Sequence, residues 1–332
     1  MKNIKLIYSK NSTLKTKISI CIPTFNRHNT YLKDSIESVL NQSSSMPIEL
    51  IVCDNSTPSD NFILYLDRIL SSNKRIKLLY FIQNSNVGMY ANWNSCIELS
   101  NSNWITILND DDLLDQSWLK NASDFLNKGR QNELAYFKIS FFGDKYKKSK
   151  YSLLNLFLNI RFLFSNISRL NLYDIFNRTM VGGSLGVLFN KKSAIEINKF
   201  NLGFLHPCSD YDFFSSYVIK YGGYYINQPG GKYRYEANET FKKGVQEKFV
   251  IGSSKIRRNI IDGVALPSLI KKSLYFGNIL HTYLSFKLYE SSVENFRIPG
   301  IKKTEFFSVS HIPLVILKVI LKIIYLPMFF VK

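Results

Sequence analysis

Three consecutive aspartates, Asp110, Asp111 and Asp112, follow directly behind an apolar run in the stretch "WITILNDDDLLDQSW". Because neighbouring carboxylates repel one another, such a run is more stable when a cation lies among them. A helix cap requires only one aspartate, and an EF-hand loop needs a glycine and a glutamate at positions where this stretch has neither. The third explanation is a hard divalent cation, Mg²⁺ or Mn²⁺, that bridges a few carboxylates to substrate phosphates. We therefore expect a metal site here.

Two further polar groups follow strand-like runs, at Pro23–Arg27 in "PTFNR" and at Asp54. The chain contains neither a GxxxxGK[ST] phosphate-binding loop nor the glycine fingerprint of dinucleotide-binding folds. A nucleotide bound at these residues would therefore need a metal to hold its phosphates. Asp54 is placed to accept a hydrogen bond from a base N–H or, alternatively, to close an Asx-turn in "DNSTPSD".

Strand-like and helix-like segments alternate from residue 18 to residue 142. This regular alternation is typical of right-handed βαβ units around a mostly parallel sheet flanked by helices. Ligands of such sheets bind beyond the carboxyl ends of the strands, so we expect the three polar groups to meet at one edge. Apolar runs predict strands at 18–23, 48–55, 76–83, 104–110 and 133–142, and periodicity predicts helices at 31–42, 61–72, 90–99 and 117–127.

The composition describes a large folded protein with a strong excess of positive charge. Its 332 residues are 45% hydrophobic, enough for a sizeable core, and the net charge of +18 favours anionic partners. The excess is uneven, because residues 241–332 hold 15 Lys/Arg against 5 Asp/Glu. We expect no nucleic acid as a partner, since no RNA- or DNA-binding module is recognisable. The wide cysteine spacing favours buried, reduced thiols at Cys21, Cys53, Cys96 and Cys208.

The apolar stretch 312–331 is interrupted by Lys318 and Lys322. A charge near the middle of a membrane-spanning helix costs about 3 kcal/mol, which disfavours a span. Lysines four residues apart share a helix face, which suits a helix lying in an anionic membrane surface, although a core helix with snorkelling lysines is the alternative. The basic segment 1–17 lacks the apolar core of a secretory signal. We expect a cytoplasmic protein, peripheral on the inner face of the cell membrane.

Four motifs together resemble, in order and spacing, those of the family 2 glycosyltransferases of GT-A fold. They are "ISICIPTFNR", "IELIVCDNST", "NVGMYANWNSCIELSNSNWITILNDDDLL" and "CSDYDFF", and the similarity covers about residues 17–240. Members of that family transfer a sugar from a nucleotide-sugar, usually with inversion and with a divalent metal. The resemblance implies a GT-A domain at 18–240, with a nucleotide-sugar half (18–142) and an acceptor half (143–240), before a basic helical region at 241–332.

The resemblance also implies roles for residues at the donor. Asp54 matches the base-contacting aspartate, and Asp110 and Asp111 match the "DxD" type pair, in which the first tends to touch the ribose and the second to ligate the metal. Asp112 completes the metal cluster, to which Asp110 is a further candidate ligand. The nucleotide-sugar site would be lined by Pro23, Thr24, Arg27, Asp54, Asn86, Gly88, Asp110 and Gly183.

On the acceptor side, Asp210 matches the family's catalytic base, with Asp212 as the alternative. Glu236, which follows the commonly persisting Arg234 in "KYRYEANET", is either a metal ligand or a solvated side chain. A base within hydrogen-bond reach of the acceptor hydroxyl would activate it for attack on the sugar's C1.

The first hypothesis is therefore a metal-dependent, inverting glycosyltransferase that builds a surface polysaccharide, such as an O-antigen or a capsule, on a lipid-linked acceptor. A UDP-sugar is favoured because Asp54 can pair with the imide N–H of uracil. Thymine offers the same imide, and guanine stays open. The alternative is a non-catalytic membrane-surface scaffold that retains the fold.

Overall fold

The computed structural model describes residues 4–28, 30–57, 60–143, 165–177, 183–203, 207–235, 243–288, 320–321 and 323–325. The chain divides into two compact units, each described here by itself. The chain leaves the first unit and returns to it twice, and its last crossing, at residues 238–239, lies next to the predicted boundary at 240. The predicted boundaries at residues 17 and 142 stay a prediction. The first unit is Met1–Leu170, Gly183–Leu202 and Ser216–Asn238; the second is Asn171–Gly182, Gly203–Ser215 and Glu239–Lys332.

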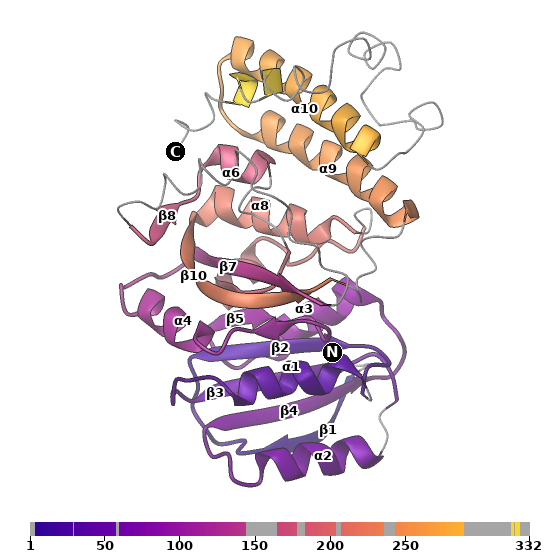
Figure 1. Cartoon of the computed structure of the whole chain (residues 1–332), viewed down its shortest axis with the longest axis vertical. Coiled ribbons are helices and arrows are strands. Elements are labelled where there is room, and N and C mark those ends of the chain that lie inside the picture. The colour runs from indigo at the N-terminus through magenta and orange to yellow at the C-terminus, as the bar shows by residue number, and fades with distance from the viewer. Residues whose placement is uncertain are drawn as a thin grey trace. The chain divides into compact units, whose positions relative to one another are not determined.

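The first unit is built on a sheet that has ten strands within the described residues, in the order β1-β4-β3-β2-β5-β9-β7-β10-β6, with β8 beside β10 (Figure 1). The central strands β4, β3, β2 and β5 run parallel, as do β7 and β10. This confirms the predicted α/β class with a central, mainly parallel sheet. The strands are β1 (Ile4–Lys10), β2 (Ile18–Thr24), β3 (Ile48–Asp54), β4 (Ile76–Gln83), β5 (Trp104–Ile107), β6 (Leu113–Leu114), β7 (Leu134–Phe142), β8 (Ile167–Arg169), β9 (Val187–Asn190) and β10 (Gly223–Arg234).

The central strands are apolar along their length because both faces of the sheet are covered. Every residue of β2 and β3 is buried, and the two strands pair in register from Ser19 opposite Glu49 to Thr24 opposite Asp54. Parallel strands in this position read as continuous apolar runs. Their ends are therefore visible in the sequence as the first polar residues. All four cysteines are buried and free, as predicted.

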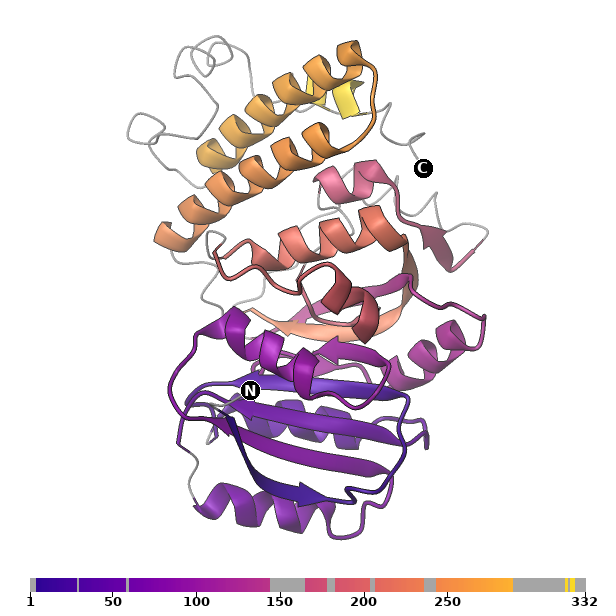
Figure 2. The same cartoon turned by 180° about the vertical axis from the view of Figure 1, so that it is seen from behind.

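Helices cover the two faces of the sheet and confirm the predicted alternation. α1 (Tyr31–Leu40) lies on the face seen in Figure 1, and α3 (Met89–Leu99) on the face seen in Figure 2. The buried side of α1 carries Leu32, Ile36 and Val39 at helical spacing. The other helices of this unit are α2 (Asp60–Leu70), α4 (Trp118–Leu126) and α7 (Lys191–Glu196).

Strand β10 passes so close to its neighbours that two glycines are required. A Cβ on Gly230 would lie 2.4 Å from the Cβ of Phe137, and a Cβ on Gly231 would lie 2.8 Å from the side chain of Leu185. β10 also pairs with β6, with Gly231 opposite Leu114. Because β6 directly follows the three aspartates, this pairing holds the acidic run at the edge of the sheet.

The basic N-terminal segment, for which the sequence predicts no element, forms the edge strand β1. It pairs antiparallel with β4, from Ile4 opposite Gln83 to Lys10 opposite Leu78. The Lys10 ammonium donates to the carboxylate of Asp67 on α2 over 2.8 Å. The short apolar pattern of this strand is hidden by its lysines, which explains why the sequence does not reveal it.

The second unit is helical in its described part. It contains α6 (Leu172–Asn177), the first residues of α8 (Ser209–Tyr221), α9 (Lys243–Gly263) and α10 (Ser268–Leu288). α9 and α10 pack side by side around an apolar cluster that includes Val250 and Leu280 (Figure 2). Among the described residues, none of the helices combines the length and the apolar character that crossing a membrane requires. Most of the predicted tail at 312–331 lies outside the described residues.

Candidate functional site

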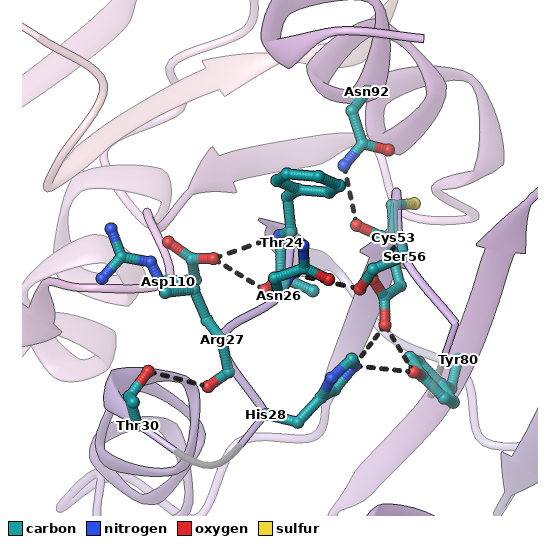
Figure 3. Close-up of polar contacts among 12 residues, drawn as sticks. Thr24, Asn26, Arg27, His28, Thr30, Cys53, Ser56, Tyr80, Asn92 and Asp110 are labelled. Atoms are coloured by element: carbon teal, nitrogen blue, oxygen red, sulfur yellow. Dashed lines mark hydrogen bonds and ion pairs between the residues drawn. The ribbon is translucent and has the colours of Figure 1, made fainter. Parts of the chain in front are cut away.

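Three segments meet at the carboxyl ends of β2, β3 and β5. The Thr24 hydroxyl donates to Oδ2 of Asp110 over 2.6 Å, and the backbone N–H of Phe25 reaches the same oxygen at 3.4 Å (Figure 3). The backbone N–H of Asn55, one residue beyond β3, donates to the carbonyl of Thr24 over 2.9 Å. Pro23 is buried in β2 beside these contacts. The polar groups that follow the three strands therefore share one edge, as the sequence predicts.

Asp112 is the most enclosed of the three aspartates, with no exposed surface. Its Oδ1 accepts the backbone N–H of Arg234 over 2.9 Å, and its Oδ2 accepts Nδ2 of Asn109 over 3.1 Å. Burial, together with the charge of Asp111, raises the pKa of the Asp112 carboxyl to about 7. A cation beside this carboxyl would offset both causes.

Asp110 is held by β2 and has a raised pKa as well. Burial is the main cause, and the charge of Asp111 adds to it, while the hydrogen bond from Thr24 and the charge of Arg27 act in the opposite direction. The result is a pKa of about 6 for the Asp110 carboxyl. Arg27 itself is half-buried and lies over the ring of Tyr31, with its Cζ 5.5 Å from the ring centroid.

Asp111 differs from its neighbours because no side chain or backbone group of another described residue donates to its carboxylate. Burial raises the pKa of this carboxyl, and the charges of Arg27 and Arg234 only partly counter the effect. A half-buried carboxylate without a donor is a fitting ligand for a hard cation. The described residues contain no cluster of three or more His, Cys, Asp or Glu side chains suited to hold a metal by themselves. The donor set thus fits Mg²⁺ or Mn²⁺ bound through few carboxylates, with the remaining ligands from substrate phosphates and water.

Arg234, at the end of β10, fixes the acidic run from outside. Its Nε donates to the backbone carbonyl of Asp111 over 2.8 Å, and its guanidinium pairs with Asp34 on α1 at 2.8 Å. The guanidinium also lies over the rings of Tyr31 and Phe142, at 4.3 and 4.6 Å. The sequence offers this residue only through the resemblance around "KYRYEANET" and does not reveal its partners. Glu236, two residues later, lies outside the described residues.

Asp54 is fully buried and already holds four donors. Its Oδ1 accepts the backbone N–H and the hydroxyl of Ser56, over 2.8 and 2.6 Å, and its Oδ2 accepts the hydroxyl of Tyr80 over 2.6 Å and contacts Nε2 of His28 (Figure 3). The bond from the Ser56 N–H is the Asx-turn that the sequence offers as the alternative. Base contact by Asp54 stays a prediction, and a base N–H would have to share or replace one of these donors. His28 and Tyr80 are missed by sequence reasoning, because they lie 26 residues from Asp54 on either side.

The loop between β4 and α3 closes on the same edge through Asn55. The Asn55 side chain donates to the carbonyl of Gly88 over 3.3 Å, and Gly88 donates its N–H to Oδ1 of Asn86 over 2.9 Å. Gly88 has a φ of 84°, a conformation that favours glycine. Asn86 and Gly88 therefore lie beside the end of β3, and their contact with a donor stays a prediction.

A further loop, just before β9, reaches the acidic run. The hydroxyl of Ser184 is buried and lies 3.5 Å from Oδ1 of Asn109, the residue that precedes the three aspartates. Gly183 is exposed next to it. Sequence reasoning included Gly183 in the nucleotide-sugar site, but it did not find the link from Ser184 to Asn109.

The two candidate base residues lie in the first turn of α8, in the second unit. Oδ1 of Asp210 accepts the backbone N–H of Tyr211 over 2.7 Å, and the Tyr211 hydroxyl donates to the carbonyl of Ile175 over 3.0 Å. Burial raises the pKa of the Asp212 carboxyl, and the charge of Lys255 partly offsets the effect. The role of either aspartate as the catalytic base stays a prediction.

Comparison with known proteins identifies relatives for much of the chain. A family model described as Glycosyl transferase family 2 matches residues 19–185, just over half of the sequence. The GalNAc(5)-diNAcBac-PP-undecaprenol beta-1,3-glucosyltransferase of Campylobacter jejuni is 32% identical over 114 residues, which are 34% of this chain and 35% of that protein. The chain spans less than half of the length of the curated relatives that it matches.

Solved structures show the same fold at low sequence identity. S. aureus TarS 1-349 in complex with UDP has a TM-score of 0.58 and 14% identity, covering 87% of this chain and 77% of that one. The mannosyltransferase PcManGT of Pyrobaculum calidifontis, in complex with GDP-Man and Mn²⁺, has a TM-score of 0.54 and 11% identity, covering 95% and 88%. These likenesses confirm the GT-A fold prediction.

Proposed function

Because this chain belongs to glycosyl transferase family 2, we propose that it transfers a sugar, with inversion, from a nucleotide-sugar to a glycan acceptor. The observation that carries the proposal is the state of Asp111, a carboxylate at the carboxyl edge of the sheet that is partly desolvated and receives no donor from another described residue. Its neighbours, the half-buried Asp110 and the buried Asp112, have raised pKa values. Such an arrangement is costly to the protein alone and becomes favourable with a cation and a diphosphate.

In this proposal Asp111 is the main protein ligand of Mg²⁺ or Mn²⁺, with Asp112 and Asp110 beside it. A bound divalent cation would offset the negative charge that develops on the departing diphosphate. Arg234 and Asn109 hold the aspartates in place, through the contacts to the Asp111 carbonyl and the Asp112 carboxylate. Glu236 remains a candidate additional ligand.

We propose a UDP-sugar as the donor. The complex of TarS with UDP supports this choice by fold, and the matching position of Asp54 supports it by its ability to accept an imide N–H. The four donors already bonded to Asp54 argue that base recognition is shared with neighbouring groups, namely the backbone at Pro23 and Thr24 and the side chain of Arg27. The thymine of a dTDP-sugar presents the same imide. A GDP-sugar is a further alternative donor, because the similar fold of PcManGT binds GDP-Man.

The acceptor side rests on Asp210. A carboxylate in this position would accept the proton of the attacking hydroxyl, with Asp212 as the alternative base. We propose that the acceptor glycan is carried on a lipid at the inner face of the membrane, in surface polysaccharide synthesis. The net charge of +10 over residues 241–332 and the undecaprenol in the name of the Campylobacter relative support this proposal.

Turnover of UDP-sugars by the purified protein tests the proposal. We expect hydrolysis of at least one UDP-sugar with Mn²⁺ present, its loss on addition of EDTA, and its loss in Asp111→Asn at saturating Mn²⁺. Asp124→Asn is the matched control, because Asp124 is an exposed carboxylate on α4 that pairs with Lys120. Turnover that persists in both EDTA and Asp111→Asn would contradict the metal assignment, and donor binding without any turnover would favour a scaffold.

A further inference from the structure

A second polar cleft lies in the first unit at the opposite ends of the same strands. It has a volume of about 680 Å³. Its boundaries include the loop 12–17, Lys77, which is the second residue of β4, and Trp104, which is the first residue of β5. These positions mark the amino ends of β2, β4 and β5. β2 is seven residues long, so the cleft lies about 20 Å from the acidic run at the carboxyl ends. Nothing in the proposed transfer reaction uses it.

The cleft collects positive charge from three separate parts of the chain. Lys15 and Lys17 come from the loop before β2, Lys77 from β4, and Arg130 from the segment after α4, and no Asp or Glu lines the cleft. Four cations at one cleft repel one another unless anions compensate them. Two of them have such anions within the protein.

Lys77 and Arg130 are the compensated pair. Nζ of Lys77 lies 3.0 Å from the buried carboxylate of Glu49, and the guanidinium of Arg130 lies 3.7 Å from Glu133. Lys15 and Lys17 are exposed and form no ion pair with any described residue. The cleft therefore has two uncompensated charges, those of Lys15 and Lys17.

The loop that carries the two lysines is held in place at both ends. Asn11, in a left-handed conformation with φ of 53°, donates from its side chain to the carbonyls of Asn73 and Ile76 over 3.0 and 2.9 Å. The Thr16 hydroxyl bonds to that of Ser102 over 2.7 Å, and Trp104 donates its N–H to the carbonyl of Lys17 over 3.2 Å. A backbone fixed in this way brings its cations to the cleft before a ligand arrives, which lowers the entropic cost of binding.

We propose that this basic cleft binds a phosphate-bearing ligand with two or more negative charges, independently of the donor site. Ammonium and guanidinium groups are the usual partners of phosphate oxygens. Asparagine and hydroxyl side chains supply further donors around them: Ser12, Thr13, Asn103 and Asn127. A phosphate monoester or diphosphate matches the two uncompensated lysines in charge. Such a group is available from a soluble phosphorylated compound or from a phospholipid headgroup.

Calorimetric titration of the full chain with inorganic pyrophosphate tests the proposal. EDTA is present, so that pyrophosphate has no metal through which to bind at the acidic run. We expect binding by the wild type that weakens by about tenfold or more in the double variant Lys15→Gln, Lys17→Gln. The matched control, Lys5→Gln with Lys192→Gln, removes the same charge from exposed positions outside the cleft and should bind as the wild type does.

Sedimentation with phosphatidylcholine vesicles, with and without phosphatidic acid, distinguishes the two sources. Loss of the phosphatidic-acid-dependent fraction in the Lys15/Lys17 double variant assigns the site to a headgroup, and its retention alongside lost pyrophosphate binding assigns it to a soluble ligand. Thermal unfolding should be unchanged in the variant, because both lysines are exposed. No pyrophosphate binding by the wild type, or equal binding by all three proteins, overturns the proposal.

Discussion

The carboxylates at the two ends of the central sheet differ in whether the protein supplies their hydrogen-bond donors. At the amino end, Glu49 is fully buried and accepts from Ser19 over 2.5 Å, from Lys77 over 3.0 Å, and from the backbone and side chain of Asn101 over 2.8 and 2.7 Å. At the carboxyl end, Asp111 is less buried and yet receives no donor from another described residue. Burial alone therefore does not mark a functional acid. The distinguishing property is whether the protein itself supplies the partners, because an acid left without them is kept for a ligand.

Asp54 combines the location of Asp111 with the bonding of Glu49. It lies at the carboxyl edge, in the position that the resemblance assigns to base contact, but its four donors make it resemble Glu49 more than Asp111. Its bonds to Ser56 order the loop behind β3, and that loop in turn holds Gly88 through Asn55. We infer that Asp54 shapes the loops around a base even where it shares the contact to it.

The largest expected effect separates activity from stability at Asp111. Asp111→Asn should lower turnover of a UDP-sugar by about 100- to 1000-fold, because it weakens electrostatic stabilisation of the leaving diphosphate. The same change should leave the thermal midpoint of the metal-free protein unchanged or higher, because it removes an unpaired, partly buried charge. Steady-state kinetics and calorimetric unfolding measure the two quantities. A large fall in the midpoint would place Asp111 with the structural acids.

The converse is expected at Glu49. Glu49→Gln should lower the free energy of unfolding by about 3 kcal/mol, because it leaves the ammonium of Lys77 without its buried partner. Turnover below the unfolding transition should be retained. Denaturant titration checks this result against Asp124→Asn, whose exposed pair with Lys120 contributes less than about 1 kcal/mol. Equal destabilisation by the two changes would contradict the structural assignment of Glu49.

The raised pKa values at the carboxyl end predict a smaller, pH-dependent effect. In the metal-free folded protein Asp110 and Asp112 bind protons up to pH about 6 and 7, whereas unfolded aspartate releases them near pH 4. The folded state therefore binds more protons over this window, so stability falls as pH rises from about 4 to 7, by about 1.4 kcal/mol per pH unit for each carboxyl that is protonated only in the folded state. Asp112→Asn should flatten this slope in EDTA. A slope of the same size in wild type and variant would show that other groups cause it.

The smallest expected effect concerns the donors on Asp54. Tyr80→Phe removes one hydrogen bond to the carboxylate and should lower the free energy of unfolding by about 1.5 kcal/mol. If Asp54 also accepts a hydrogen bond from the base, the oxygen that Tyr80 no longer occupies should be free for it. UDP binding, measured by calorimetry, should then tighten by a few-fold. Tyr65→Phe is the matched control, since the Tyr65 hydroxyl bonds to Glu37 instead. Weaker UDP binding in Tyr80→Phe alone would give Tyr80 a more direct part in the site.

Sequence reasoning predicted the central sheet well for a physical reason. β2, β3 and β4 are apolar runs that stop at Thr24, Asp54 and Gln83, so their ends are visible in the letters, and parallel pairing aligns those ends. The edge strand β1 is different, because its lysines conceal it. β10 is also concealed, because Pro229, Gly230 and Gly231 interrupt its sequence; in the structure the two glycines allow close packing on β7 and on Leu185.

The candidate site was predicted in its acids but not in their partners. A run of three aspartates is conspicuous in the sequence, whereas the donors that hold Asp54 and Asp112 are single residues of ordinary type at distant positions. His28 and Tyr80, and the partners of Arg234, became identifiable only when the sheet brought these residues within hydrogen-bond distance. The difference between a satisfied acid and an unsatisfied one is consequently a property of the folded chain.

The bond from Arg234 to Asp34 joins residues that are 200 positions apart. During synthesis, α1 and all three aspartates leave the ribosome long before the residue that braces them has been translated. A nascent chain that ends before β10 would already contain every proposed metal ligand of the acidic run, but not Arg234, whose contacts orient them. Competence for donor binding should therefore appear late and abruptly in elongation, which would spare the cell unproductive capture of nucleotide-sugars by unfinished copies.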